Sequence, residues 1–153
     1  MTAAELRDYL HAHIPLTRAL AIDVLAIDDD HASLSAPLAP SVNHRQTAFG
    51  GSVSALAILA GWAWLHARLA TLAPAARLVI QRQEMDYLLP VDDAFVASCL
   101  APTPAAWERF ARLLAARGRG RIELAAEVSC RGRLTATFRG TYVAIASERA
   151  DQE

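Results

Sequence analysis

A polar segment in the middle of the chain leads directly into two adjacent glycines. It reads Asn43-His44-Arg45-Gln46-Thr47-Ala48-Phe49-Gly50-Gly51-Ser52, and an uncharged apolar stretch follows it. We expect that stretch to be a helix, whose first turn carries unpaired backbone N–H groups and the positive end of the helix dipole. The glycines would let a ligand approach the backbone closely, or would serve only a tight turn into the helix. On the first interpretation, the segment predicts a seat for a carbonyl oxygen that gains negative charge.

A second group of chemically capable side chains lies further along the chain. Arg82, Glu84 and Asp86 are two residues apart, so they share one face of a predicted strand. The two carboxylates could act as a general base. The alternative, which we favour, is a charge ladder in which they pair with Arg82 or with the matching strand of a second subunit.

The composition excludes several other kinds of chemistry. All 15 basic residues are arginines, so Schiff-base chemistry on a lysine and a lysine-bearing phosphate loop are both ruled out. The formal net charge of −1 does not suit a protein that coats nucleic acid. Cys99 and Cys130 form no CxxC pair, and no Cys/His cluster has the spacing of a zinc site, so no metal is expected.

Location and domain organisation are predicted from the same sequence. The first residues are mixed in charge and lack the apolar core of a signal peptide, which favours a cytoplasmic protein. Residues 46–65 are uncharged, but Ser, Gly and Gln interrupt the first part. We interpret this run as a buried central helix, with no membrane involved. No linker or repeat divides residues 1–153, so one domain is expected, with a core over about 16–146 and a frayed tail from 147.

Hydrophobic periodicity and turn residues give the expected elements. Thr103 followed by Pro104 marks the start of a short helix, and Gly118 and Gly120 mark its end. Ser52 or Gly51 is the expected N-cap of the central helix. The elements in chain order are a helix over 3–13 stopped by Pro15, strands over 22–27 and 31–36, the central helix over 50–69, strands over 77–88 and 94–100, the short helix, and strands over 121–129 and 134–145.

Six strands and one helix that is apolar on all sides predict an α+β fold. The simplest arrangement is an antiparallel sheet wrapped around the central helix. The long strand over 77–88 is then an edge on which a second copy of the chain could pair. We therefore expect a homodimer with a continuous sheet.

The order of elements, together with Asn43 and the Phe49-Gly50-Gly51 triplet, resembles the hotdog superfamily of acyl-thioester enzymes. Many of its thioesterases carry Asn, five residues, then His-Gly-Gly. The strand end over 84–90 resembles their Tyr-Leu-x-Pro, and the resemblance covers about residues 16–146. Phe49 replaces the His. Ile58 stands where those thioesterases place a catalytic Asp or Glu, and no acid occurs between Gly50 and Leu69.

Within that superfamily, residues 43–52 are similar to the stand-alone malonyl-ACP decarboxylases, a thioesterase-like domain family. The resemblance implies decarboxylation of malonyl-ACP to acetyl-ACP, which can prime fatty-acid synthesis. It implies that the Asn43 amide orients the thioester or stabilises the enolate, assisted by N–H groups at Gly50, Gly51 and Ser52. It also implies no cofactor beyond the substrate's own phosphopantetheine, with an acyl carrier protein or CoA as the acyl carrier. Hydrolysis with His44, Glu84 or Asp86 as base, or acyl-thioester binding without catalysis, are the alternatives.

The other loop side chains have two interpretations each. His44 could hydrogen-bond the substrate carboxylate or only brace the loop. Arg45 could pair with that carboxylate or with phosphopantetheine, or be ordinary surface. Thr47 and Ser52 could donate to the substrate, and Ser52 could equally be only a cap. Phe49 is expected beside the substrate.

One local excess of positive charge stands out near the end of the chain. Five arginines fall within 109–121 against a single acid, Glu108. Arg109 and Arg112 could dock an acidic carrier protein by electrostatic steering. A solvated helix face explains them equally well.

Overall fold

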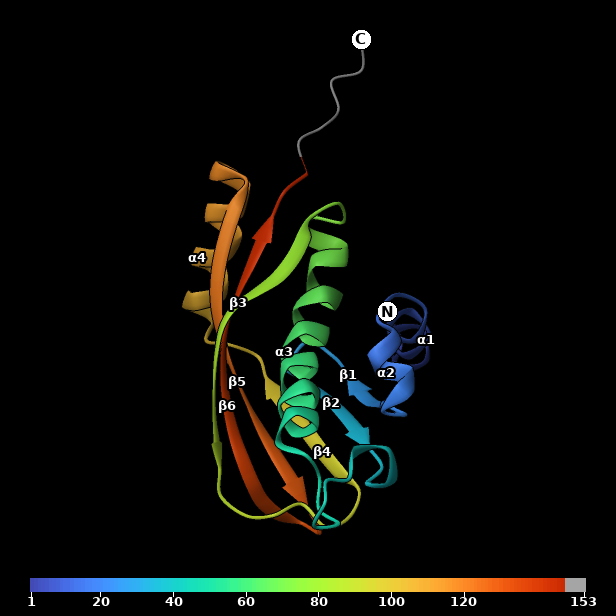
Figure 1. Cartoon of the computed structure of the whole chain (residues 1–153). Coiled ribbons are helices and arrows are strands. Elements are labelled where there is room, and N and C mark those ends of the chain that lie inside the picture. The colour runs from blue at the N-terminus through green and yellow to red at the C-terminus, as the bar shows by residue number, and fades with distance from the viewer. Residues whose placement is uncertain (148–153) are drawn as a thin grey trace.

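The structure, a computed structural model, describes residues 1–147. The frayed tail expected from residue 147 falls almost entirely outside the described residues. Figure 1 shows the arrangement of the elements. In chain order they are α1 (Ala3–His13), α2 (Pro15–Ala19), β1 (Asp23–Ile27), β2 (His31–Ala36), the 3₁₀ turn η1 (Ala39–Ser41), α3 (Gly50–Leu72), β3 (Arg77–Tyr87), β4 (Phe95–Leu100), α4 (Pro104–Arg117), β5 (Arg119–Cys130) and β6 (Arg133–Ile145).

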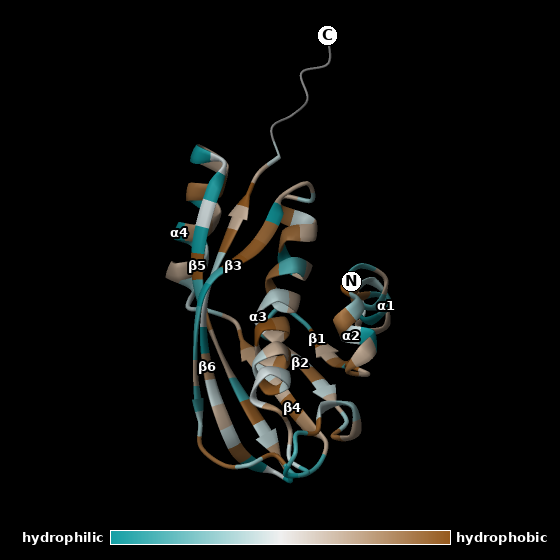
Figure 2. Ribbon diagram, viewed as in Figure 1, coloured by the Kyte–Doolittle hydropathy of each residue, from teal (hydrophilic) through white to brown (hydrophobic). Residues whose placement is uncertain are grey.

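The six strands form one antiparallel sheet in the order β1-β2-β4-β5-β6-β3, with α3 against one face. This confirms the predicted sheet around a central helix. Hydrophobic residues recur along α3 and alternate with hydrophilic ones along β5 and β6 (Figure 2). By length and composition α3 could cross a membrane, but it packs against strands from both halves of the sheet. That packing assigns it to the core.

The predicted elements are found within a few residues of their expected ends. Thr103 caps α4 by accepting a hydrogen bond from the Ala106 N–H at 3.2 Å, and Gly118 ends it with a φ of 68°. Helix α2 differs from the prediction, in which Pro15 only stops the preceding helix, because proline also suits the first position of a helix. The N-cap of α3 is Phe49, which corrects the expectation of Ser52 or Gly51.

Strand β3 lies at one edge of the sheet and pairs only with β6. This confirms the predicted edge position. Strand β4 pairs with β5 from Phe95 opposite Cys130 to Cys99 opposite Ala126, so the first half of β5 has no strand on that side. Helix α4 packs along this first half. A Cβ on Gly120 of β5 would lie 2.8 Å from the ring of Phe110, which shows how closely α4 approaches.

A buried contact fixes α3 against β6. The Tyr142 hydroxyl donates to the Ile58 carbonyl at 2.6 Å, and burial raises the pKa of this phenol. Gly61 lies beneath the ring, and a Cβ there would be 2.5 Å from the Tyr142 oxygen. Glycine is therefore required at this position by close approach of a ring.

We predict that Gly61→Ala lowers the free energy of unfolding by about 1–3 kcal/mol, the usual cost of overpacking a core. Urea unfolding measures it. The same substitution in a Tyr142→Phe background should cost less, because phenylalanine lacks the oxygen that the new methyl group meets. An equal loss in both backgrounds would show that the ring oxygen is not the obstacle.

Helix α1 is held to α3 by a stack of aromatic rings. Tyr9 stacks on His13 with centroids 4.1 Å apart, and His66 stacks on Trp62 at 4.4 Å. Tyr9 and His66 are 4.6 Å apart, which joins the two pairs. His66 is half-buried in this stack. Burial, and secondarily the nearby His13, lower its pKa.

This lowered pKa predicts a loss of stability in mild acid. The unfolded chain takes up the proton at His66 near the ordinary value of 6.5, whereas the folded chain resists it. The contribution of neutral His66 to the free energy of unfolding is therefore fully present above that pH. It is lost as the pH falls through that value towards the folded pKa. Urea unfolding at about pH 7.5 and 5.5 measures the loss, and His66→Phe, which keeps a stacked ring, should lose less. An identical pH response in the variant would contradict this role.

Candidate functional site

The loop before α3 is a closed turn organised by Asn43. The Asn43 Oδ1 accepts from the backbone N–H groups of Arg45 at 2.8 Å and Thr47 at 3.2 Å. Its Nδ2 donates to Thr47 Oγ1 at 2.9 Å, and its backbone N–H donates to the Thr47 carbonyl at 2.7 Å. A carboxamide both accepts and donates, which this turn requires. One of the two amide N–H bonds of Asn43 is left for a ligand.

The start of α3 presents two backbone donors. Within residues 1–147, the N–H groups of Gly50 and Gly51 have no acceptor, as expected for a first helical turn. The Ser52 N–H already donates to the Phe49 carbonyl at 2.9 Å. This corrects the expectation that Ser52 contributes its N–H, and the Ser52 side chain is buried.

Two aromatic rings pack against the glycines. A Cβ on Gly51 would lie 2.4 Å from the ring of Phe49, so the space left by the missing side chain is filled by that ring. Phe49 is otherwise 61% exposed. The Tyr87 hydroxyl donates to the Gly50 carbonyl at 2.9 Å. Tyr87 belongs to the strand end that carried the resemblance, but no role was assigned to it from the sequence.

The side of β3 that faces α3 carries no acid. Tyr87 contacts Gly50, and Gln83 accepts a 3.4 Å hydrogen bond from Ser54 of α3. Residues 83, 85 and 87 therefore point towards α3, and Glu84 and Asp86 point away from it. Glu84 pairs with Arg82 at 2.9 Å. The structure thus does not bring these carboxylates to the helix start, and it favours the charge-ladder interpretation for Glu84.

Helix α3 leaves one strip of its surface partly open. Ala55, Ile58 and Trp62 share this strip and are neither fully buried nor fully exposed. Ile58 therefore occupies a partly accessible apolar position about two turns from the free N–H groups. No acidic residue occurs anywhere in α3.

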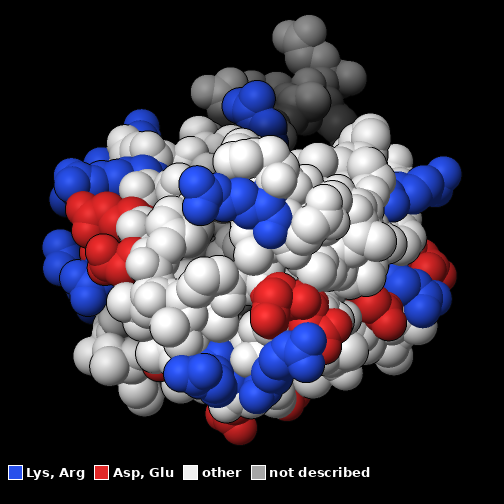
Figure 3. Space-filling model, turned by 60° about the horizontal axis from the view of Figure 1, so that its bottom comes forward, with Lys and Arg blue, Asp and Glu red and all other residues white. Residues whose placement is uncertain are grey.

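His44 and Arg45 lie at the surface of the loop. Neither side chain has a hydrogen-bond or ion-pair partner within residues 1–147. Figure 3 looks towards this end of the molecule and shows acidic and basic side chains next to one another around wide uncharged areas. Both side chains are thus free to meet a ligand, and neither braces the loop through a hydrogen bond or an ion pair with residues 1–147.

The remaining candidates lie away from this loop. Arg109 and Arg112 are exposed on α4, the helix that packs against β5. The two cysteines are buried and free, and burial raises the pKa of Cys99 to about 12. Among residues 1–147 no group of three or more His, Cys, Asp and Glu side chains is arranged to hold a metal ion.

Comparison with known proteins places these features in context. Residues 3–146 match the model of a family described as Putative thioesterase (yiiD_Cterm). A comparison with the curated proteins finds no match.

Three solved structures are similar to this chain. A Chlorobaculum tepidum protein of unknown function is 26% identical with a TM-score of 0.89, over 95% of this chain and 94% of that one. A putative thioesterase from Shewanella oneidensis is 29% identical with a TM-score of 0.79, over 94% and 96%. A thioesterase from Haemophilus influenzae, 15% identical over 99% and 96% with a TM-score of 0.77, shares the fold.

Proposed function

The chain belongs to the family described as Putative thioesterase (yiiD_Cterm), with the hotdog fold, and from that membership we propose that it decarboxylates malonyl-ACP to acetyl-ACP. The family supports chemistry on an acyl thioester. The choice of reaction depends on one observation within residues 1–147, which is that neither α3, whose first turn carries the free N–H groups of Gly50 and Gly51, nor the side of β3 that faces α3 contains an acidic residue. Hydrolysis needs a base or a nucleophile at that place.

Decarboxylation of a malonyl thioester needs neither a general base nor a nucleophile. The bond between the malonyl carboxyl carbon and Cα breaks and releases CO₂. Its electron pair forms the enolate of the thioester, and a proton from water then converts Cα to the methyl group of the acetyl product. The thioester oxygen gains the negative charge, and the Gly50 and Gly51 N–H groups, with the free N–H of Asn43, are the donors that would stabilise it.

The surroundings also suit the loss of a charged group. Phe49 and Tyr87 are large, more than half exposed, and in contact with the glycines. A poorly hydrated site destabilises the bound carboxylate relative to CO₂. His44 and Arg45, two exposed polar side chains of the preceding loop, would position the carboxylate before it leaves.

A second copy of the chain would complete this apolar site. β3 is a free edge, and Val79, Tyr87 and Leu88 along and beyond it are each at least half exposed. Antiparallel pairing of two β3 strands would bury these side chains and satisfy the backbone groups of the edge. The proposed enzyme is thus a cytoplasmic homodimer, with a carrier protein delivering the malonyl group.

Mass spectrometry of malonyl-ACP and malonyl-CoA after incubation with the protein tests the reaction. We expect loss of the mass of CO₂ with the thioester intact, faster on the carrier protein.

Asn43→Ala should lower turnover by roughly 10²–10³, the usual effect of losing one oxyanion donor. Asn43→Asp keeps the two accepted loop hydrogen bonds but cannot donate, so it should be as inactive. Full activity of Asn43→Asp would assign Asn43 to the loop alone. If the unaltered chain leaves both malonyl-ACP and malonyl-CoA unchanged, the result would indicate thioester binding without catalysis.

Hydrolysis is the second candidate, because the Shewanella oneidensis relative is a putative thioesterase. We predict that Ile58→Asp, which places a carboxylate on the open strip of α3, yields free malonate and unacylated carrier. Ile58→Asn is the matched control, equal in size but without a base. Equal hydrolysis by both variants, or hydrolysis by the unaltered chain, would mean that the base lies elsewhere, with His44 the first to replace.

A further inference from the structure

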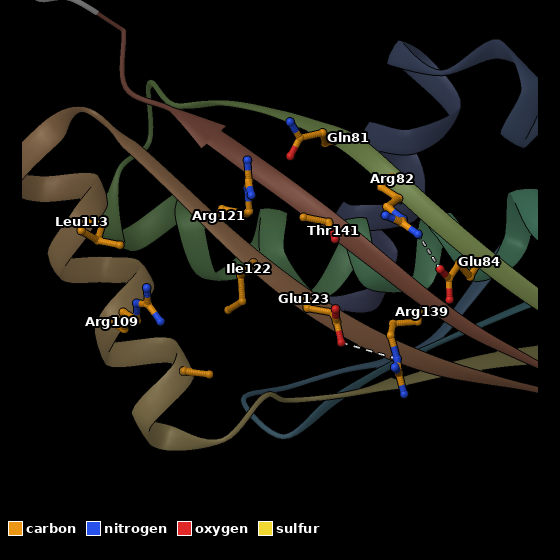
Figure 4. Close-up of a pocket in the computed structure, with 11 residues that line it drawn as sticks. Gln81, Arg82, Glu84, Arg109, Leu113, Arg121, Ile122, Glu123, Arg139 and Thr141 are labelled. Carbon is orange, nitrogen blue, oxygen red and sulfur yellow. Dashed lines mark hydrogen bonds and ion pairs between the residues drawn. The ribbon is translucent and has the colours of Figure 1, made fainter.

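A hollow in the described part of the molecule lies away from the proposed site. It has a volume of about 1130 Å³ and is bounded by α4 on one side and by β5, β6 and β3 beneath. Figure 4 shows Arg109 of α4 and Arg121 of β5 directed into the same space, with Arg82 and Arg139 further along. This volume is of the size that proteins use to hold small molecules, on the order of 300–1,000 Å³.

The groove opens on the face of the sheet opposite α3. Tyr142 of β6 points inward to bond the Ile58 carbonyl of α3. Its neighbour Thr141, which lines the groove, therefore points outward. In Figure 4, α3 is seen behind the sheet. The groove and the Gly50 site are thus separated by the sheet, and a ligand in one does not reach the other.

The charges in the groove are unequally paired. Glu84 is ion-paired with Arg82 at 2.9 Å, and Glu123 with Arg139 at 3.5 Å. Arg109 and Arg121 have no acidic partner within residues 1–147. Two uncompensated guanidinium groups from different elements therefore face one hollow, which makes it a positively charged site.

We propose that this groove binds a small organic phosphate that carries at least two phosphate groups. A guanidinium group presents a planar set of donors that matches phosphate oxygens, so Arg109 and Arg121 can each take one phosphate. Leu113 offers apolar surface to the organic part, and Gln81 and Thr141 offer hydrogen bonds. The groove has α4 as a wall along one side, which suits a compact ligand better than the broad surface of a protein.

The Glu123–Arg139 pair sets the strength of this site. The two side chains are exposed and their contact is long, so the pair is weak and can be broken by substitution of one member. Replacing Glu123 with glutamine removes a negative charge and frees Arg139 as a third cation. The proposal thus predicts a variant that binds more tightly, which a purely structural role of these residues would not produce.

Isothermal titration of the whole chain with pyrophosphate, ADP, inorganic phosphate and adenosine tests the site. We expect binding of ADP and pyrophosphate, weaker binding of phosphate, none of adenosine, and a loss of affinity with added salt. Arg109→Gln and Arg121→Gln should each weaken ADP binding about five- to tenfold, and Glu123→Gln should strengthen it.

Two control variants separate this site from others. Arg117→Gln removes an exposed arginine of α4 that does not line the groove, and Arg45→Gln removes the cation beside the Gly50 site; both should bind ADP as the unaltered chain does. Equal binding of adenosine, an unchanged affinity in Arg109→Gln and Arg121→Gln, or a loss in Arg45→Gln would overturn the proposal. Because no acyl substrate is used, these outcomes are independent of the decarboxylation test.

Discussion

The burial of one uncharged helix governs this structure. From Gly50 to Ala67 the helix α3 has no charged side chain, so it cannot remain in water and the sheet curves around it. Because α3 is buried, its covered side makes close contacts with the sheet, such as that of Gly61 with the ring of Tyr142. Burial also excludes acidic residues from α3 itself, including the turns next to its N-terminus. The chemistry open to the site is therefore limited by the same composition that makes the core.

The burial of α3 ends at its N-terminus, and this is where we place the functional site. Phe49 caps α3 without a side-chain hydrogen bond, and two glycine N–H groups remain without acceptors. Asn43 stabilises the preceding turn through hydrogen bonds of both its side-chain oxygen and its side-chain nitrogen. The same residue thus shapes the loop and keeps one N–H for a ligand, and its two roles are joined through Thr47.

Strong local signals in the sequence account for what could be predicted. Thr103-Pro104 and Gly118 fix the ends of α4, and the alternation in β5 fixes its two faces. Three features were not predictable, because each depends on contacts between residues far apart in sequence. They are the Tyr87 bond to Gly50, the ring stack that half-buries His66, and the helix that replaces a strand beside the first half of β5.

That last replacement affects how the sheet can grow. Helix α4 covers the part of β5 that β4 leaves unpaired, and α1 packs on β1, whose pairing is already interrupted by a bulge. Among the described residues β3 is then the one long strand whose edge is free. A sheet with two open edges can add copies without end and form fibres, whereas a sheet with one open edge closes after a single addition. If two chains pair through β3, as we propose, the edge left at each end of the combined sheet is the short strand β1, against which α1 packs.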